Sequence, residues 1–462
     1  MRANHRLPIV ISCAAGAGMC TTVLVFYPGI MSWDSIVQFQ QASTRVISGD
    51  FHPPIMAYVW HYIHQLIPGP FGMMLLHNLM FWTGLALIAF ACRLGTLGAT
   101  ICILGIGFFP PVFGLLGILW KDVGMGAALT LSIGMMLVGA RESSILLVAL
   151  SILPLFYALS VRPNAPAAII PFAVLVFWSA DTALGTQLLK LRAYVCLSLI
   201  LTLTLFVTSR AMNRAIVTSM PPDVPETALQ FSMLHDLEGI SVRIGQVRFP
   251  VYVRRTRPEI TMGALHRMYD PADVNRFVFN DYWETNSFYT WNRNEFDELV
   301  RYWWDSVTTY PTAYLGHRSQ VLATMFQIRG IHYPFQEGFA NNDLGLHFQP
   351  TLFYLYVVAF LNRTKEVFFR GWVFLGIALT IMSYGWFRGR WISATVCASG
   401  VLYVLPYVVV SCGSDFRFIW WLVVSTLISV PLLVGETAAP FVPKYVKTGD
   451  SLRGESPGKI HN

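Results

Sequence analysis

Charged side chains are scarce in this chain. Asp, Glu, Lys and Arg make up only 12% of its 462 residues, whereas 55% of the residues are hydrophobic. A soluble domain carries about 25% charged residues, and several apolar runs here approach the roughly 20 residues that cross a bilayer as a helix. The composition therefore predicts an all-α polytopic membrane protein. Its net charge of +7 is expected to lie in loops that set the orientation, and nucleic acid is not expected as a partner.

Metal-binding and disulfide patterns are missing as well. Six of the seven cysteines fall in apolar runs, and Cys412 stands at the end of one. None has the spacing of metal ligands or of a disulfide framework, so they are interpreted as small core residues. No glycine-rich phosphate loop follows a strand-like run. The absence of such a loop argues against a bound nucleotide. No cofactor is expected. A divalent metal is possible, but no feature of the sequence supports one.

Long apolar runs are what the sequence does contain. The predicted membrane spans number roughly ten, at residues 7–26, 71–91, 96–119, 123–140, 144–160, 165–180, 194–209, 369–387, 391–412 and 418–435. No small-residue cleavage site follows the first run. We therefore expect that run to stay in the protein as a span and not to act as a cleaved signal peptide.

The spans divide the chain into four parts. Residues 1–209 are predicted to form a transmembrane module with a first outer loop at 27–70, and residues 210–363 a polar, mainly helical exterior domain. Residues 364–435 hold the last spans, and residues 436–462 form a tail of disordered composition. Basic residues such as Arg93, Arg141 and Arg388 gather in the short loops on the N-terminal side. This bias predicts that both termini are cytoplasmic.

In the short loops and at the span ends on the opposite side, ionisable residues are few. They stand in four separate turns: Asp34 and His52 in the first outer loop, Lys121 and Asp122 in "GILWKDVGMG", Arg162 and Asn164 in "ALSVRPNAP", and Asp415 and Arg417 in "SCGSDFRFIWW". Ionisable groups at membrane depth are costly and mark functional sites by default. We therefore predict that the four turns converge on one outward-facing site.

These residue types suit a phosphate and a hydroxyl group. Lysine and arginine can hold a phosphate, and arginine does so through two parallel hydrogen bonds. A carboxylate within hydrogen-bond reach can take a proton from a hydroxyl. Nucleotide-activated sugars are cytoplasmic, so an outward site favours a donor that is linked to a lipid phosphate.

The first outer loop carries the most specific pattern. It has an acid in "SWDS" at residues 32–35 and "HPP" at residues 52–54, and many spans and a polar domain follow. In these features the chain resembles the GT-C superfamily, polytopic glycosyltransferases that use polyprenyl-phosphate-linked sugars. Relatives in that superfamily include protein O-mannosyltransferases, aminoarabinose transferases and O-antigen glucosyltransferases. Many of them carry two adjacent acids in this loop, whereas here Ser35 follows Asp34.

The resemblance implies a glycosyltransferase of the bacterial inner membrane, with its active site facing the periplasm or exterior. Asp34 matches the acid that serves as catalytic base, and Lys121, Arg162 and Arg417 are candidates for contact with the lipid phosphate. The implied partners are a polyprenyl-phosphate-sugar donor, a glycan, lipid or protein acceptor, and the bilayer. Transfer is expected to invert the sugar, and the single acid weakens the case for a metal.

Structural roles are alternatives for several of these residues. Asp34 is also suited to cap a helix at residues 35–41. His52 either contacts a phosphate or sugar, or positions a helix that begins at the following prolines. Asp122 is able to neutralise Lys121 alone.

Further candidates lie outside the four turns. Trp33 and Trp120 are interpreted as members of an interfacial aromatic belt, and His77, inside a span, as a buried and hydrogen-bonded histidine. In the exterior domain, "MLHDLEGISVR" places His235 and Asp236 side by side. These two residues are candidate contacts for the donor or acceptor.

Two other functions compete with glycosyl transfer. A non-catalytic flippase or transporter of lipid-linked glycans is one, although the sequence shows neither the internal repeats nor the interrupted spans that are typical of transporters. A polysaccharide polymerase or ligase is the other. Such enzymes use the same kind of donor, so only the loop around Asp34 favours the transferase.

Overall fold

The computed structural model describes residues 6–49, 52–186, 191–218, 227–279 and 288–438. Within these ranges the chain is helical, and its only β-type pairings are two isolated bridges, Ile30 with Ile118 and Asp273 with Gly413. The predicted all-α class is confirmed at this level.

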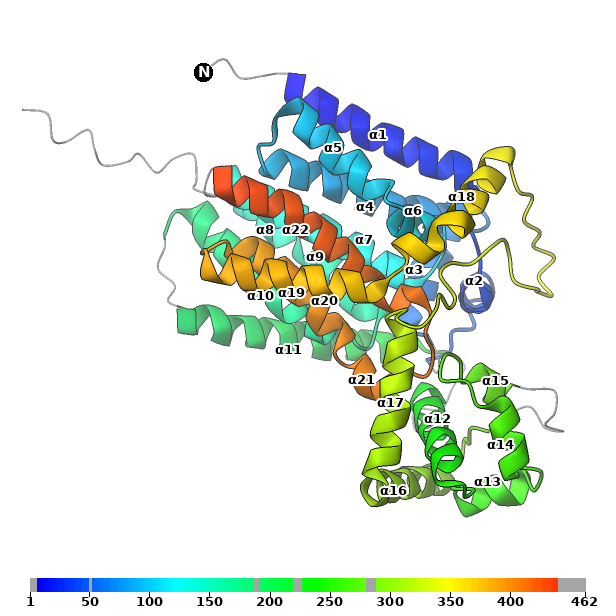
Figure 1. Cartoon of the computed structure of the whole chain (residues 1–462). Helices are drawn as coiled ribbons and strands as arrows, with labels where there is room; N and C mark the ends of the chain where they lie inside the picture. Colours follow the sequence, from blue (N-terminus) through cyan, green and yellow to red (C-terminus); the bar gives the residue numbers. More distant parts are fainter. Residues whose placement is uncertain (1–5, 50–51, 187–190, 219–226, 280–287, 439–462) are drawn as a thin grey trace, which may run out of the picture.

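Seven helices in the described residues are long and apolar enough to cross a membrane. They lie side by side (Figure 1). Their bounds are α1 (Arg6–Phe26), α4 (Phe71–Ala91), α7 (Lys121–Arg141), α10 (Pro166–Leu184), α11 (Leu191–Ile216), α20 (Trp391–Val404, extended by α21, Tyr407–Val410) and α22 (Trp420–Ala438, preceded by the 3-10 turn η1, Phe416–Ile419). The chain is thus a multi-spanning membrane protein, as the composition predicts.

Two further spans are bent helix pairs, which raise the count to nine if each pair is one span. The first pair, α5 (Gly95–Gly107) and α6 (Pro110–Leu116), bends by 64°, and the second, α18 (Leu352–Phe368) and α19 (Gly371–Phe387), by 58°. The span predicted at residues 96–119 is therefore not a single straight helix. Pro110 and Pro111 lack the amide hydrogens that would continue α5, and proline instead suits the first turn of a new helix.

The span predicted at residues 144–160 is a shorter apolar helix, Ile145–Val161. It comprises α8 (Ile145–Leu150) and α9 (Ile152–Val161).

At the other end of the chain, α22 continues to Ala438 and includes Glu436. The carboxylate of Glu436 accepts the backbone amide hydrogens of Ile392 and Ser393, at 2.9 and 3.0 Å. Residues 439–462, the rest of the predicted tail, lie outside the described residues.

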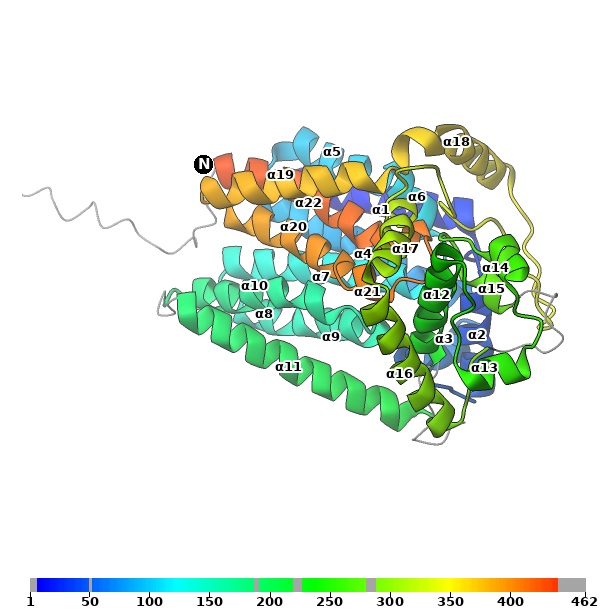
Figure 2. The same ribbon diagram turned by 60° about the horizontal axis from the view of Figure 1, so that its bottom comes forward.

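Shorter helices gather at one end of the long ones, and Figures 1 and 2 agree on this placement. Two of them belong to the loop after α1, namely α2 (Trp33–Thr44) and α3 (Pro54–Leu66). The others form what we call the polar domain: α12 (Thr227–Ile244), α13 (Val251–Thr256), α14 (Met262–Met268), α15 (Asn275–Val278), α16 (Arg293–Thr309) and α17 (Pro311–Met325). The polar domain has a hydrophobic core of its own, which includes Leu234, Phe249 and Phe277.

Helix α7 lies at the centre of the long helices. In its most apolar window 89% of the residues are buried, against 22% in α11. Glycines allow its neighbours to approach closely: a Cβ at Gly84 of α4 would lie 2.6 Å from the backbone of Thr130 and Leu131. The first turn of α7 carries Lys121 and Asp122, so the most buried helix also brings two of the predicted site residues to the end where the polar domain lies.

Candidate active site

The chain after α1 is attached to the chain before α7. The amide of Ile30 donates to the carbonyl of Gly117 at 2.8 Å, and the carbonyl of Ile30 accepts the amide of Leu119 at 3.0 Å. The hydroxyl of Ser35 also donates to the carbonyl of Leu119, at 2.9 Å. These bonds fix the start of α2 beside the start of α7, and so bring the first two of the four predicted turns together.

Helix α2 begins at Trp33, with Ser32 in the N-cap position, and no side chain caps it. Asp34 stands in the first turn, where the positive end of the helix dipole favours a carboxylate. The interpretation of Asp34 as the N-cap of this helix is therefore wrong, and its carboxylate is directed to another partner.

That partner is Arg417 of η1. Its Nη1 donates to Asp34 Oδ2 at 2.5 Å, and its Nε donates to Asp415 Oδ2 at 2.8 Å. Its Nη2 forms an ion pair with the same Asp415 oxygen at 2.7 Å. The two carboxylates are partly exposed, with side-chain exposures of 27% for Asp34 and 26% for Asp415. One arginine thus joins the first and the last of the predicted turns, and solvent reaches both of its carboxylate partners.

Aromatic rings hold the Arg417 guanidinium in place. Its central carbon lies 4.8 Å from the ring centre of Trp120 and 5.2 Å from that of Phe418. Trp120 is buried, and its indole nitrogen donates to Ser32 Oγ at 2.7 Å. The aromatic-belt interpretation of Trp120 is therefore wrong. Trp33, in contrast, is largely exposed, as a residue of such a belt would be.

The middle turns contribute two further contacts. Lys121 Nζ lies 2.9 Å from His52 Nδ1, so the second half of the first loop also reaches α7. Pro54 begins α3, with Pro53 as its N-cap residue, as the sequence predicts. His52 itself precedes that cap, and its ring is directed to Lys121.

Asp122 pairs with Arg162 and not with Lys121. Arg162 Nη2 forms an ion pair with Asp122 Oδ1 and donates to the Tyr407 hydroxyl at 2.7 Å. The Tyr403 hydroxyl donates to the same carboxylate oxygen at 3.1 Å. This ion pair is closed to solvent, because only 9% of the Arg162 side chain and 1% of the Asp122 side chain are exposed. The interpretation that Asp122 only neutralises Lys121 is wrong.

Asn164 lies at the edge of this closed pair. It interacts with the Tyr407 hydroxyl, and its amide nitrogen has no hydrogen-bond partner among the described residues. Tyr403 and Tyr407 were not predicted from the sequence. Two hydroxyls four residues apart at the end of an apolar span are the signal that would have identified them.

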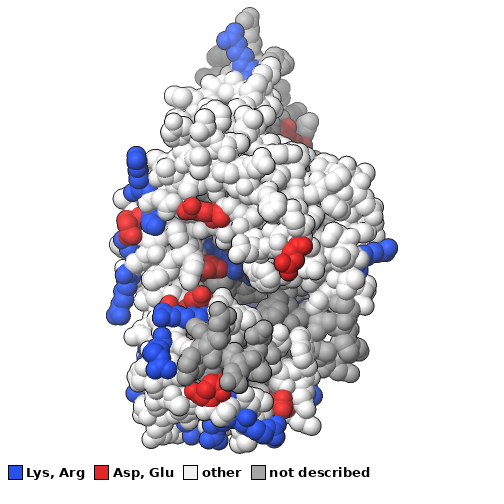
Figure 3. Space-filling view, turned by 90° about the vertical axis from the view of Figure 1, so that its right-hand side faces the viewer, with Lys and Arg blue, Asp and Glu red and all other residues white. Residues whose placement is uncertain are grey.

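The four predicted turns therefore converge. We call the group that they form the charge cluster: Asp34, His52, Lys121, Asp122, Arg162, Asp415 and Arg417. It lies where the long helices meet the polar domain, and Figure 3 shows a hollow between these two parts, with acidic and basic side chains inside it. Among the described residues, no three His, Cys, Asp or Glu side chains are arranged to hold a metal ion.

The charges in the cluster determine the protonation of its members. Burial raises the pKa of Asp34, but Arg417, His52 and Lys121 together outweigh this effect and hold that pKa well below its usual range. Burial and the nearby Lys121 lower the pKa of His52 to about 3. Asp34 is thus ionised and His52 neutral at neutral pH. The cluster then contains as many carboxylates as strong cations.

The polar domain holds the segment that carries Asp415 and Arg417. Arg318 Nη1 of α17 donates to the Ser411 carbonyl at 2.6 Å, and the Ser414 hydroxyl donates to the Ala272 carbonyl at 2.8 Å. The position of Arg417 therefore depends on helices of the polar domain as well as on η1.

His235 and Asp236 lie inside the polar domain and do not join the charge cluster. Both are fully buried. Asp236 Oδ2 accepts hydrogen bonds from Arg318 at 2.6 Å and from the Trp303 indole at 2.8 Å. His235 Nε2 lies 3.1 Å from the Asp270 carbonyl, and burial lowers its pKa to about 3. The two side chains support the fold of the domain, and neither is open to a substrate.

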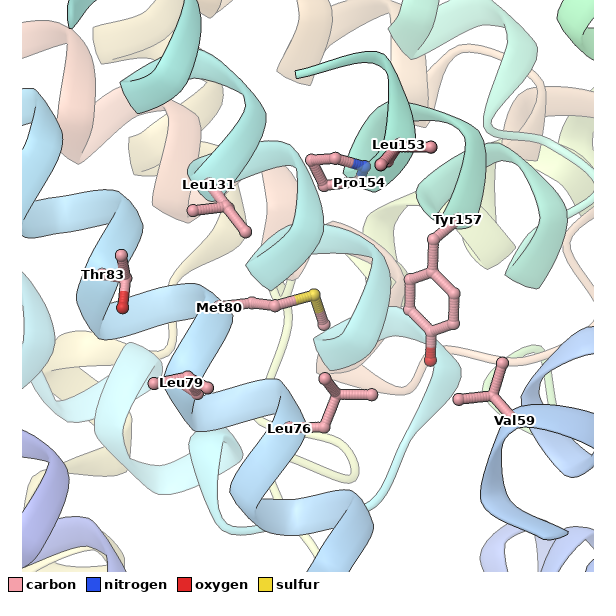
Figure 4. Close-up of a pocket in the computed structure, with 9 residues that line it drawn as sticks. All are labelled: Val59, Leu76, Leu79, Met80, Thr83, Leu131, Leu153, Pro154 and Tyr157. Carbon is pink, nitrogen blue, oxygen red and sulfur yellow. The ribbon is translucent and has the colours of Figure 1, made fainter. Parts of the chain in front are cut away.

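An apolar cavity of about 510 Å³ lies between α3, α4, α7 and α9. Figure 4 shows its lining, in which Tyr157 carries its hydroxyl towards Leu76 and Val59: Val59, Leu76, Leu79, Met80, Thr83, Leu131, Leu153, Pro154 and Tyr157. No member of the charge cluster lines this cavity.

Two side chains, Tyr157 and His77, lie between the cavity and the charge cluster. The Tyr157 hydroxyl lies 3.2 Å from Nε2 of His77, which is buried and hydrogen-bonded as predicted. A Cβ at Gly124 would lie 2.6 Å from the same nitrogen, so His77 packs directly against the first turn of α7. That turn begins with Lys121 and Asp122. The cavity therefore lies one layer of side chains below the charged residues.

Comparison of the sequence with known protein families and with curated proteins finds no match.

Proposed function

We propose that this chain is a membrane glycosyltransferase of the GT-C type, which moves a sugar from a polyprenyl-phosphate carrier to a hydroxyl of a cell-envelope acceptor. In this proposal the protein lies in a bacterial inner membrane, with the charge cluster and the polar domain on the periplasmic side. Ten crossings would result if, beside the seven long helices, each bent pair and the shorter helix Ile145–Val161 also crossed the membrane.

The observation that carries the proposal is the solvent-accessible pair formed by Asp34 and Arg417 where the membrane-spanning helices meet the polar domain. A carboxylate that solvent can reach is next to a cation that aromatic rings hold in place. An ion pair that only supports the fold is expected to be closed to solvent, as the pair of Asp122 and Arg162 is. The apolar cavity below the cluster offers space for part of an isoprenoid chain.

Each residue then has a role in the transfer. Asp34 accepts the proton of the acceptor hydroxyl, whose oxygen forms a bond to the anomeric carbon. The bond from that carbon to the phosphate oxygen breaks, and its electron pair stays on the phosphate. Attack opposite the leaving group inverts the sugar. Arg417 and Lys121 stabilise the charge of the leaving phosphate. Arg162 keeps the first turn of α7 in position through its ion pair with Asp122.

The proposal is tested by Asp34→Asn in purified membranes that are supplied with a panel of polyprenyl-phosphate sugars. Asparagine keeps the shape of the side chain but cannot take a proton, so we expect transfer to fall by about two to four orders of magnitude. Folding should be retained, because Asp34 does not cap α2. Transfer is read by thin-layer chromatography of the product.

Asp305→Asn is the matched control. Its side chain is 64% exposed on α16, where it pairs with Arg248 and has no contact with the cluster. Transfer by this variant should equal that of the parent. Near-parental transfer by Asp34→Asn would remove Asp34 as the base. Absence of transfer from every donor in the parent protein would remove the proposed function.

A further inference from the structure

Arg417 is bound unequally by its two carboxylates. Asp415 accepts a hydrogen bond from Nε, forms an ion pair with Nη2, and lies two residues away in the same turn. Asp34 accepts from Nη1 alone, and belongs to a separate helix. Displacing Asp34 therefore breaks one contact to the guanidinium, whereas displacing Asp415 breaks two and disturbs η1.

The surroundings of Arg417 allow such an exchange. Trp120 and Phe418 fix the guanidinium, while the Asp34 side chain remains 27% exposed to solvent. Phosphate oxygens match the paired donors of an arginine, and such bonds are shorter and stronger than neutral ones. An incoming phosphate therefore meets a cation that is already oriented and a carboxylate that is free to move away.

The charge balance of the cluster supports the same conclusion. As it stands, carboxylates and strong cations are equal in number, so a bound phosphate leaves an excess of negative charge. This excess is relieved when one carboxylate takes up a proton. Asp34 is the suitable carboxylate, because Asp122 is enclosed with Arg162 and Asp415 remains on Arg417.

We propose that the phosphate of the lipid donor displaces Asp34 from Arg417, so that the carboxylate becomes an effective base only after the donor has bound. This inference rests on the proposed function and adds an order of binding: donor first, acceptor second. An acceptor hydroxyl that arrives first meets a carboxylate that is still engaged by arginine.

Burial and the neighbouring cations act on Asp34 in opposite directions, which explains how the exchange activates it. Burial raises its pKa, while Arg417 and Lys121 lower it. Once phosphate neutralises Arg417, the raising effect prevails and the carboxylate becomes a stronger base. His52 lowers the pKa of Asp34 when its ring is protonated, and Asp415 is close enough for Asp34 to raise its pKa.

The test is equilibrium binding of farnesyl phosphate, a short-chain isoprenyl phosphate, to the full-length protein in lipid nanodiscs. Because Asp34 competes with the phosphate for Arg417, Asp34→Asn should tighten binding by about fivefold, the scale of a partly exposed ion pair. Arg417→Gln should weaken binding by about tenfold or more.

Asp273→Asn is the matched control for a general effect of charge. Asp273 lies near enough to Asp415 to interact with it electrostatically, but does not contact Arg417. Its loss should change the affinity by less than about twofold. Equal tightening by Asp273→Asn and Asp34→Asn, or weaker binding by Asp34→Asn, would overturn the displacement and leave the transferase proposal standing. No binding by the parent or any variant would overturn both.

Discussion

From the sequence, Arg162 and Arg417 are both candidates for contact with the lipid phosphate. Only their neighbours in the structure distinguish them. Asp122 and two tyrosine hydroxyls enclose Arg162, whereas Arg417 holds two carboxylates that solvent reaches. Ionisable residues at span ends are rare, so the turns could be predicted from the sequence. The partner of each residue could not, because the tyrosines stand 241 and 245 positions from Arg162 and ordinary hydrophobic patterning does not indicate them.

Glu238 of α12 provides a prediction at the scale of one residue. It is fully buried, and neither carboxyl oxygen has a hydrogen-bond partner among the described residues. Burial, reinforced by Asp270, holds its pKa well above the ordinary value. A raised folded-state pKa favours the fold at low pH, and this contribution is lost as the pH rises through that pKa. The parent protein should therefore lose stability on the alkaline side.

Glu238→Gln keeps the size of the side chain and removes this titration. We expect the thermal unfolding temperature to match or exceed that of the parent near about pH 9, and to vary less between about pH 5 and pH 9. Glu366→Gln is the control, since Glu366 is exposed on α18 and pairs only with Arg370 of the same turn. A variant that is less stable than the parent at high pH would show that Glu238 is ionised in the fold.

At the scale of helices, small residues decide how the long elements pack. Hydrophobic runs could be counted from the sequence, and most predicted spans correspond to helices. The break between α5 and α6 was missed although Pro110 and Pro111 stood in the sequence, because the apolar run continues through them without interruption. The contact between α4 and α7 was also outside the reach of the sequence, since glycines that touch a neighbour look like glycines that face lipid.

Gly84→Ala tests this close contact. The new Cβ would lie 2.6 Å from backbone atoms of Thr130 and Leu131, which cannot rotate away as a side chain can. The two helices must separate, and overpacking of this kind costs about 1–3 kcal/mol. We therefore expect a lower unfolding temperature in detergent, measured by the exposure of buried cysteines to a fluorescent thiol reagent.

Gly16→Ala is the matched control for Gly84→Ala. Gly16 also lies inside an apolar helix, α1, but a Cβ there meets no atom within 4 Å. Alanine favours a helix by about 0.5–1 kcal/mol over glycine, so this variant should be as stable as the parent or more stable. Equal stability of the two variants would contradict the close approach of α4 and α7.

At the scale of the whole molecule, one of the segments that join the polar domain to the long helices carries two of the site residues. Residues 411–417 run from α21 to η1, and their backbone and side chains bond to Arg318, Ala272 and Gln327. The sequence predicted a polar, helical region here, but it could not show that this region fixes the segment with Asp415 and Arg417. Such contacts join positions that are far apart in the chain, so no local pattern records them.

The orientation in the membrane gives the last prediction, because transfer from a periplasmic donor requires the charge cluster to face outward. Asn275 is exposed in α15 of the polar domain, and Arg388 is exposed between α19 and α20, at the opposite end of the long helices (Figure 1). The basic residues of the short loops lie at this opposite end, which the positive-inside rule assigns to the cytoplasm. In intact cells, a membrane-impermeant maleimide should label Asn275→Cys above the background that Cys412 gives in the parent chain. Arg388→Cys should react only after the cells are permeabilised. Labelling of Arg388→Cys in intact cells, with Asn275→Cys protected, would place the charge cluster in the cytoplasm and exclude the periplasmic reaction.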